Sequence, residues 1–220
     1  MCTLRLTYFG MLGLAEPIRL ALAISGERWE DHQINGDDYV KLIENGELPW
    51  GMVPVLKTPH GVLAESGAIL RYAGDLSGLV PNDSWNRAKV NEICDTLDNM
   101  IDLLRPSWGI RTLASRIAFR HALIAGDGEM TRWFTLFDEL LSKQTHGWCA
   151  GTKSISIADL KLFTIFFGWT SGQYDGFEED MLDGYENIIN HHHLVSNHPK
   201  VFEYYQNLEP DDIRVVYQPR

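Results

Sequence analysis

A glutamate and a serine stand side by side where a helix is expected to begin, and they form the first candidate for binding chemistry. Glu65-Ser66 opens a run of helix-forming residues that reaches Tyr72. The free amides and the dipole at a helix start favour an anion, so Ser66 could hold a carboxylate. The carboxylate of Glu65 could attract an ammonium group. Ser66 could equally be an ordinary N-cap. Both interpretations stay open from these residues alone.

Two further groups of polar residues could bind a cation. Asp95, Asp98 and Asn99 lie three and four residues apart on an expected helix, so they share a face, which could also be a solvated acidic face. Neighbouring residues on a helix point about 100° apart, so the run 191–193 of three histidines cannot converge on one metal ion. We expect these histidines at the surface.

Composition and charge exclude several classes of protein. The chain of 220 residues carries a net charge of -11, which argues against binding to nucleic acid or to an anionic membrane surface. Its three cysteines, Cys2, Cys94 and Cys149, show no Cys-x-x-Cys spacing, which argues against disulfides or structural zinc. We expect a cytoplasmic protein without a signal peptide or membrane span.

The elements that must position these residues fall into two regions. In the first, hydrophobic periodicity and turn residues predict a strand, a helix and a strand, and then two strands and a helix. The expected ranges are a strand at 3–7, a helix at 15–26, a strand at 29–34, an irregular loop with a short helix at 35–51, strands at 53–56 and 62–64, and a helix from 65.

The second region is expected to be entirely helical. Turn residues at 77–83 mark the boundary, and apolar residues then recur three or four apart from Ser84 to Leu104, as an amphipathic helix requires. Pro106 should stop or kink this helix. Further helices are expected at 111–125, 130–143, 157–168, 182–193 and 199–208. The predicted domains are 1–80 and 84–220.

An ordered set of motifs resembles the cytosolic glutathione transferases, with the sigma class closest and the mu class next. The motifs are Tyr8-Phe9-x-x-x-Gly13-x-Ala15-Glu16-Pro17-Ile18-Arg19, Val53-Pro54-Val55-Leu56, Glu65-Ser66-x-Ala68-Ile69-x-Arg71-Tyr72 and Asp95-Thr96-Leu97-Asp98. The resemblance implies a thioredoxin-like βαβ-ββα glutathione-binding domain, followed by an all-α domain that supplies the hydrophobic substrate site and the dimer interface. Ser156 to Leu160 is similar to the family's helix capping box, a folding element.

The resemblance implies that Tyr8 is the catalytic residue, because its hydroxyl would donate a hydrogen bond to the thiolate of glutathione. It also implies that the Val53-Pro54 bond is cis and that the backbone of Val53 pairs with the cysteinyl part of glutathione. Ser66 and Glu65 would hold the γ-glutamyl end, and Asp98 of the partner subunit in a homodimer would reach its ammonium group.

The expected contacts at the glycine end of glutathione differ from the family pattern. Tyr39 stands where sigma enzymes usually carry tryptophan, Met52 where lysine or glutamine is common, and Leu12 and Leu14 where arginines are frequent. Lys41 is the nearby cation. These changes predict weaker glutathione affinity. The resemblance implies that Leu14, Tyr39, Lys41, Met52 and Val53 all contact glutathione, with Val53 at its cysteinyl part.

A small hydrophobic electrophile would contact Phe9, Met11, Leu12 and Trp108, and these residues, apart from Met11, could alternatively be core between the two domains. The expected activity is conjugation of the glutathione thiolate to such electrophiles, in detoxification, with glutathione as co-substrate and no required metal. The alternatives are a glutathione-dependent prostaglandin D isomerase and a non-catalytic crystallin-like or ligand-carrier protein. In sigma prostaglandin synthases the acidic cluster binds a divalent ion, and that possibility stays open for Asp95, Asp98 and Asn99.

Overall fold

The computed structural model describes residues 4–219 and divides the chain into two compact units, one ending at Pro81 and the other beginning at Asn82. The N-terminal unit contains a four-stranded sheet in the order β2-β1-β3-β4. Strand β1 (Leu4–Phe9) pairs in parallel with β2 (Trp29–Ile34) and antiparallel with β3 (Val55–Thr58), which pairs antiparallel with β4 (Gly61–Ala64). The predicted thioredoxin-like arrangement of strands and helices is confirmed.

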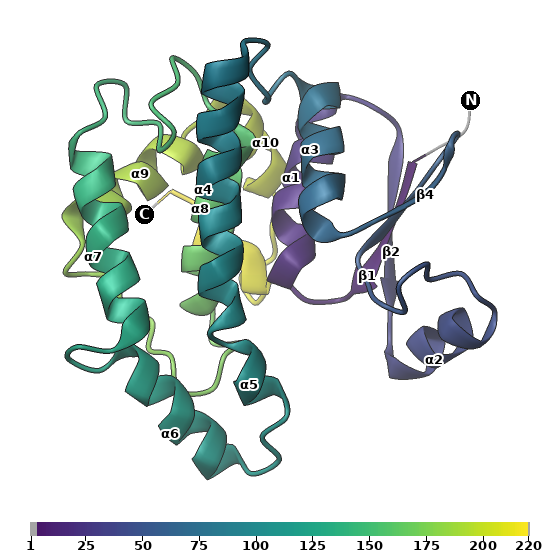
Figure 1. Cartoon of the computed structure of the whole chain (residues 1–220), viewed down its shortest axis with the longest axis horizontal. Helices are drawn as coiled ribbons and strands as arrows, with labels where there is room; N and C mark the ends of the chain where they lie inside the picture. Colours follow the sequence, from purple (N-terminus) through teal and green to yellow (C-terminus); the bar gives the residue numbers. More distant parts are fainter. Residues whose placement is uncertain (1–3, 220) are drawn as a thin grey trace. The chain divides into compact units, whose positions relative to one another are not determined.

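Three helices complete the N-terminal unit. Helix α1 (Glu16–Ser25) follows a short 3-10 turn at Gly13–Ala15, and α1 packs against α3 (Ser66–Ser77) beside the sheet (Figure 1). The segment between β2 and β3 contains α2 (Gly36–Glu44), whose first turn is held by a capping box between Asn35 and Asp38. An asparagine followed by an acid three residues later is therefore the signal that starts this helix.

The C-terminal unit contains only helices and turns among its described residues, as predicted. The long helix α4 (Ser84–Asp102) begins at an N-cap, Asp83, and the four-residue α5 (Arg105–Trp108) follows it with Pro106 in its first turn. The remaining helices are α6 (Leu113–Ile124), α7 (Glu129–Ser142), α8 (Ile157–Trp169), α9 (Glu186–Ser196), α10 (Pro199–Tyr205) and a 3-10 turn at Ile213–Tyr217.

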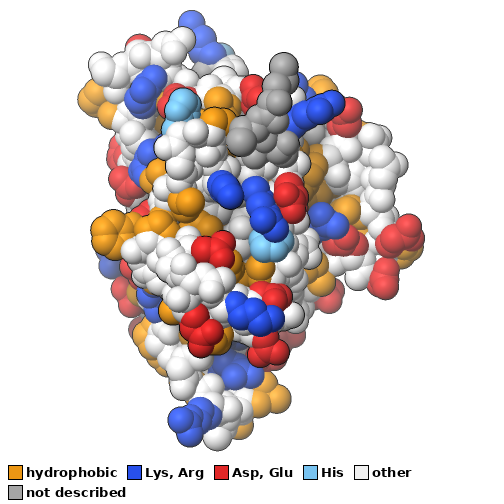
Figure 2. Space-filling model, turned by 90° about the vertical axis from the view of Figure 1, so that its right-hand side faces the viewer, with side chains coloured by type: hydrophobic (Ala, Val, Ile, Leu, Met, Phe, Trp, Pro, Cys, Tyr) orange, Lys and Arg blue, Asp and Glu red, His pale blue; other side chains and the backbone are white. Residues whose placement is uncertain are grey.

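Helix α8 forms the centre of this unit. All of its residues are buried, and it contacts α4, α9 and the C-terminal 3-10 turn. The capping box predicted at its start is present, because the side chains of Ser156 and Asp159 each bond the backbone of the other. No helix within residues 4–219 is both long and apolar enough to cross a membrane. Acidic and basic side chains are interspersed on the face shown in Figure 2.

Candidate functional site

Tyr8 lies near the end of β1, with its hydroxyl against the loop that follows the strand. The hydroxyl oxygen accepts a hydrogen bond from the backbone N–H of Leu14 at 3.4 Å. Burial raises the pKa of Tyr8 above the ordinary value for tyrosine, although the Leu14 amide and the charge of Arg19 partly offset that effect. The phenol is therefore protonated near neutral pH. Since the Leu14 amide occupies an oxygen lone pair, the hydroxyl proton is available to donate.

Gly13 allows this close approach of the loop to the tyrosine. Its backbone has φ +46°, a conformation that residues with a side chain rarely adopt. A Cβ atom at this position would lie 2.7 Å from the hydroxyl oxygen of Tyr8. Any side chain at position 13 would thus displace the hydroxyl or the loop.

Arg19 donates hydrogen bonds to the backbone of the same loop and of the strand end before it. It is 3% exposed, and its guanidinium donates to the carbonyl of Met11 at 2.7 Å and to that of Phe9 at 3.1 Å. Its Nε donates to the carboxylate of Asp31 on β2 at 3.1 Å. The guanidinium carbon lies 5.9 Å from the centre of the Tyr8 ring. One buried cation thus ties the end of β1, its loop and β2 together.

Arg19 belongs to a motif that is visible in the sequence, but the motif alone predicts no role for it. The available signal was the spacing of Glu16 and Arg19, because an acid and a base three residues apart meet on a helix. In the structure their side chains form a buried ion pair at 3.2 Å. The two backbone acceptors have no sequence signature, so their part in the network could not be predicted.

Leu14 lies in the 3-10 turn before α1, whereas the other residues expected at the glycine end of glutathione lie on α2 and on the segment that follows it. The Tyr39 hydroxyl donates to the carbonyl of Gly51 at 2.6 Å, and the Tyr39 ring lies 5.7 Å from that of Phe9. Lys41 and Asp38 are 3.5 Å apart, with both side chains largely in solvent. Met52 is exposed. Lys41, the cation expected for this part of the site, is thus already beside an acid.

The segments expected to hold the rest of glutathione have distinctive backbone conformations. The Val53-Pro54 peptide bond is cis, as expected. Glu65 has φ 70°, the sole non-glycine residue with positive φ among the described residues, and it occupies the N-cap position of α3. Ser66 is the first helical residue, so the alternative of Ser66 as the N-cap is wrong. A backbone conformation of this kind is commonly retained at functional sites.

The residues expected to contact an electrophile occur in both units. Phe9 and Met11 are half-buried near the end of β1, whereas Leu12 is almost completely buried. In the other unit Trp108 ends α5 with half of its side chain exposed, and the guanidinium of Arg105 lies 5.6 Å from its ring centre. Leu12 therefore belongs to the core, as the alternative interpretation held, while Phe9, Met11 and Trp108 offer apolar surface.

Asp98 forms an ion pair within its own chain. Its Oδ2 lies 2.6 Å from the Nζ of Lys161, a buried residue of α8 that also donates to the carbonyl of Cys94 at 2.9 Å. The Asp98 side chain is still partly exposed on α4. A fixed ammonium group beside this carboxylate opposes the binding of a divalent cation there.

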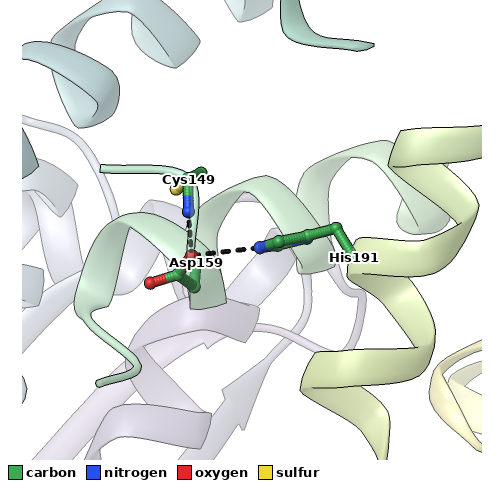
Figure 3. Close-up of side chains that lie close together, drawn as sticks. All are labelled: Cys149, Asp159 and His191. Atoms are coloured by element: carbon green, nitrogen blue, oxygen red, sulfur yellow. Dashed lines mark hydrogen bonds and ion pairs between the residues drawn. The ribbon is translucent and has the colours of Figure 1, made fainter. Parts of the chain in front are cut away.

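A second polar cluster lies in the core of the C-terminal unit (Figure 3). The potential metal-binding atoms of Cys149, Asp159 and His191 lie within 4.8 Å of one another. The Asp159 carboxylate, however, already accepts hydrogen bonds from the Cys149 amide, from the amide and hydroxyl of Ser156, and from His191. Burial and the charge of Asp159 raise the pKa of the Cys149 thiol well above its usual value. A protonated thiol and a saturated carboxylate indicate a folding element rather than a metal centre.

The expectation that the three histidines lie at the surface is wrong for two of them. His191 is 2% exposed and meets Asp159 at 3.0 Å. His192 is also buried, with its Nε2 3.1 Å from the carbonyl of Val216 and its ring 4.0 Å from that of Phe167. The cause is that α9 turns this face toward α8, where a polar ring atom finds a partner in the core. Neither Cys94 nor Cys149 forms a disulfide, and Cys2 lies outside the described residues.

Comparison with known proteins agrees with the fold. Residues 4–75 match the glutathione S-transferase N-terminal domain, and residues 125–207 match the glutathione S-transferase C-terminal domain. Glutathione S-transferase 1 of Ascaris suum is 30% identical over 174 residues, which cover 76% of this chain and 80% of that protein. Hematopoietic prostaglandin D synthase of Gallus gallus is 35% identical over 99 residues, 45% of this chain and 49% of that protein.

A solved structure, that of prostaglandin synthase D of Nilaparvata lugens, has the same fold, with a TM-score of 0.81 and 24% identity over 94% of this chain and 99% of that one. The chain belongs to the glutathione S-transferase family. It is a glutathione transferase, an enzyme that conjugates glutathione, its co-substrate, to electrophiles. The non-catalytic alternative is therefore not retained.

Proposed function

We propose that Tyr8 holds the glutathione sulfur as a thiolate for attack on a hydrophobic electrophile. The observation that carries this proposal is the buried Tyr8 hydroxyl, which accepts from the Leu14 amide and keeps its own proton to donate. Lowering a thiol pKa from about 8.5 by about two units requires roughly 2.7 kcal/mol. A hydrogen bond to a charged acceptor supplies about 1.5–3 kcal/mol, so one well-placed donor nearly suffices.

The γ-glutamyl end of glutathione is assigned to the start of α3. Its free amides and dipole favour the carboxylate, with Ser66 adding a hydroxyl donor, while the exposed Glu65 side chain attracts the ammonium group. Val53, beside the cis bond, is assigned to the backbone of the cysteinyl residue. These two segments and Tyr8 all belong to the N-terminal unit, which is the proposed glutathione-binding domain.

The glycine end of glutathione is assigned to Leu14, Tyr39, Lys41 and Met52. Support for weak binding there comes from the Tyr39 hydroxyl, which already donates to Gly51, and from Lys41, which has Asp38 beside it. Met52 adds no charge or strong donor. We therefore expect glutathione affinity below that of relatives that carry a lysine or arginine at this end, and ordinary tight binding in a titration would contradict that expectation.

The electrophile is assigned to Phe9, Met11 and Trp108, whereas Leu12, which was also expected to contact it, is almost completely buried. Their apolar surfaces suit a hydrophobic substrate. The biological role proposed is detoxification in the cytoplasm, within the sigma class. Prostaglandin isomerisation is a weaker second candidate, since the match to the prostaglandin D synthase of Gallus gallus covers under half of this chain.

A homodimer is proposed from two exposed tryptophans and from the partner contact that the family resemblance implies for Asp98. Trp50 after α2 and Trp85 on α4 are 70% and 73% exposed, and tryptophan is enriched at protein interfaces. The proposal also assigns Asp98 to the ammonium group of glutathione bound in the partner subunit, although Lys161 already holds one of its oxygens. A monomer in sizing chromatography would contradict both the dimer and this contact.

The test of the assigned chemistry is to measure kcat/KM for conjugation of glutathione to a chloronitrobenzene acceptor in the parent and in Tyr8→Phe. Loss of one charge-assisted hydrogen bond should lower kcat/KM by about tenfold to a hundredfold. Tyr72→Phe on α3 makes the same chemical change as a matched control. Equal rates for the parent and Tyr8→Phe would exclude the assigned role of Tyr8.

A further inference from the structure

The short helix α5 carries Trp108 but is too short to hold its own position. A helix of four residues has almost no intrinsic stability, so other contacts must fix it. Within α5, the residues Arg105, Pro106 and Trp108 are exposed, whereas Ser107 is 0% exposed. The Ser107 hydroxyl donates to the carbonyl of Leu104 at 2.7 Å. Ser107 is therefore the residue through which α5 is anchored.

The partner of Ser107 is a buried arginine on α6, which lies beside α5 (Figure 1). Arg120 donates from Nε to the Ser107 hydroxyl at 3.1 Å and from Nη1 to the backbone carbonyl of Asp175 at 3.1 Å. Its guanidinium carbon also lies 5.6 Å from the ring centre of Tyr174. One planar donor group thus joins α5 on one side to the segment after α8 on the other.

A second arginine, one turn earlier on α6, extends this arrangement. The Arg116 guanidinium lies 2.7 Å from the Asp175 carboxylate, and its Nη1 donates to the carbonyl of Ile110 at 3.3 Å. A Cβ at Gly176 would lie 3.1 Å from the Cα of Ile117, so the backbone of this segment rests directly on α6. We name the group of Arg116, Arg120 and Asp175 the arginine strap.

We propose that the arginine strap positions Trp108, and that Arg120 is thereby a specificity-determining residue for the electrophile. This rests on the proposed function, in which Trp108 contacts that substrate. The strap fixes the chain on both sides of Trp108, at Ser107 and at Ile110, so it sets where the exposed indole lies. A rigid indole favours flat, bulky electrophiles, whereas a small electrophile needs less of this surface. The strap has no part in binding glutathione.

The experiment measures KM for glutathione and for a bulky and a small aromatic electrophile in the parent, Arg120→Met, Trp108→Ala and the double variant. Arg132→Met, an exposed residue of α7, is the matched control. We expect Arg120→Met to raise KM for the bulky electrophile by about tenfold, because misplacement of a substrate contact has effects of at least this size. KM for glutathione should not change, and the effect should disappear in the Trp108→Ala background.

Three results would overturn the inference while leaving the proposed electrophile site intact. The first is that Arg120→Met raises KM for the bulky electrophile by the same factor in the parent and in the Trp108→Ala background. The second is that Arg120→Met raises KM for glutathione as much as it raises KM for the bulky electrophile. The third is no effect on the bulky electrophile, while Trp108→Ala alone raises its KM. If Trp108→Ala itself leaves that KM unchanged, the proposed electrophile site falls, and the strap inference with it. Should Arg120→Met not fold, Arg120→Lys and Ser107→Ala break the same link and must raise the same KM.

Discussion

The two units of the chain each contain a buried charge surrounded by hydrogen bonds, and the two charges have opposite sign. In the N-terminal unit Arg19 donates to the carbonyls of Phe9 and Met11 and pairs with acids. In the C-terminal unit Asp159 accepts from the backbone of Cys149 and Ser156 and from His191. Both are charges whose burial is costly without partners.

The difference between the two centres is in what their partners do. The backbone acceptors of Arg19 belong to the end of β1 and to the loop that follows it, so this network shapes the proposed site at Tyr8. The donors to Asp159 belong to the start of α8, to the segment before it and to α9, so that network joins elements of the core. The comparison teaches that a buried ionic centre is functional or structural according to the elements it joins, not according to its charge or burial.

The largest effect is expected at Asp159. Replacement by alanine removes a carboxylate that satisfies several buried donors and should lower the free energy of unfolding by about 3–5 kcal/mol. Denaturant unfolding followed by circular dichroism measures this change. Asp211→Ala, at an exposed site, is the control and should change it by less than about 0.5 kcal/mol. A loss below about 1 kcal/mol for Asp159→Ala would refute the structural role.

The next effect is expected at Gly13. In Gly13→Ala the new methyl group would lie 2.7 Å from the Tyr8 oxygen, so the hydroxyl must move. We expect kcat/KM for conjugation to fall by about a hundredfold, as for other misplaced catalytic groups. Gly26→Ala is the control, because it also places an alanine at positive φ, 74°, but its Cβ would have no atom within 4 Å. It therefore separates the effect of backbone strain from that of displacing Tyr8. Similar activity losses in the two variants would contradict the explanation.

A smaller effect is expected at Arg19. In Arg19→Lys the positive charge is kept, but a single ammonium group cannot reach the two carbonyls and the Asp31 carboxylate together. The loop should loosen, and kcat/KM should fall by about tenfold. Arg5→Lys, at a more exposed ion pair of β1, provides the control. If Arg19→Lys lowers the free energy of unfolding without lowering kcat/KM, Arg19 is a structural centre like Asp159, and the proposed difference between the two networks is wrong.

Much of the fold was predictable because its signals are local. The capping box at Ser156 and Asp159 and the cis Val53-Pro54 bond were expected from motifs. The first strand was expected at 3–7 from its alternation of polar and apolar residues, and β1 extends beyond that range to Phe9. Local patterns also predicted the helical content after residue 81, because apolar spacing reports one helix at a time.

What could not be predicted depends on contacts between distant segments. His191 and Asp159 are 32 positions apart, and Asp98 and Lys161 are 63 apart, so neither pair has a sequence spacing to recognise. The first pair explains why a polar histidine run is partly buried. The second places a lysine inside a buried helix that, apart from Asp159 and Thr164, has no other polar side chain. Such partners become visible only when the helices are packed.

The central claim is that the Tyr8 hydroxyl stabilises the thiolate of bound glutathione. The most direct measurement is a pH titration of the thiolate ultraviolet absorbance of glutathione bound to the parent and to Tyr8→Phe. We predict that the parent holds the thiol pKa well below about 8.5, and that Tyr8→Phe raises it by about one to two units. An unchanged thiol pKa in Tyr8→Phe would contradict the account.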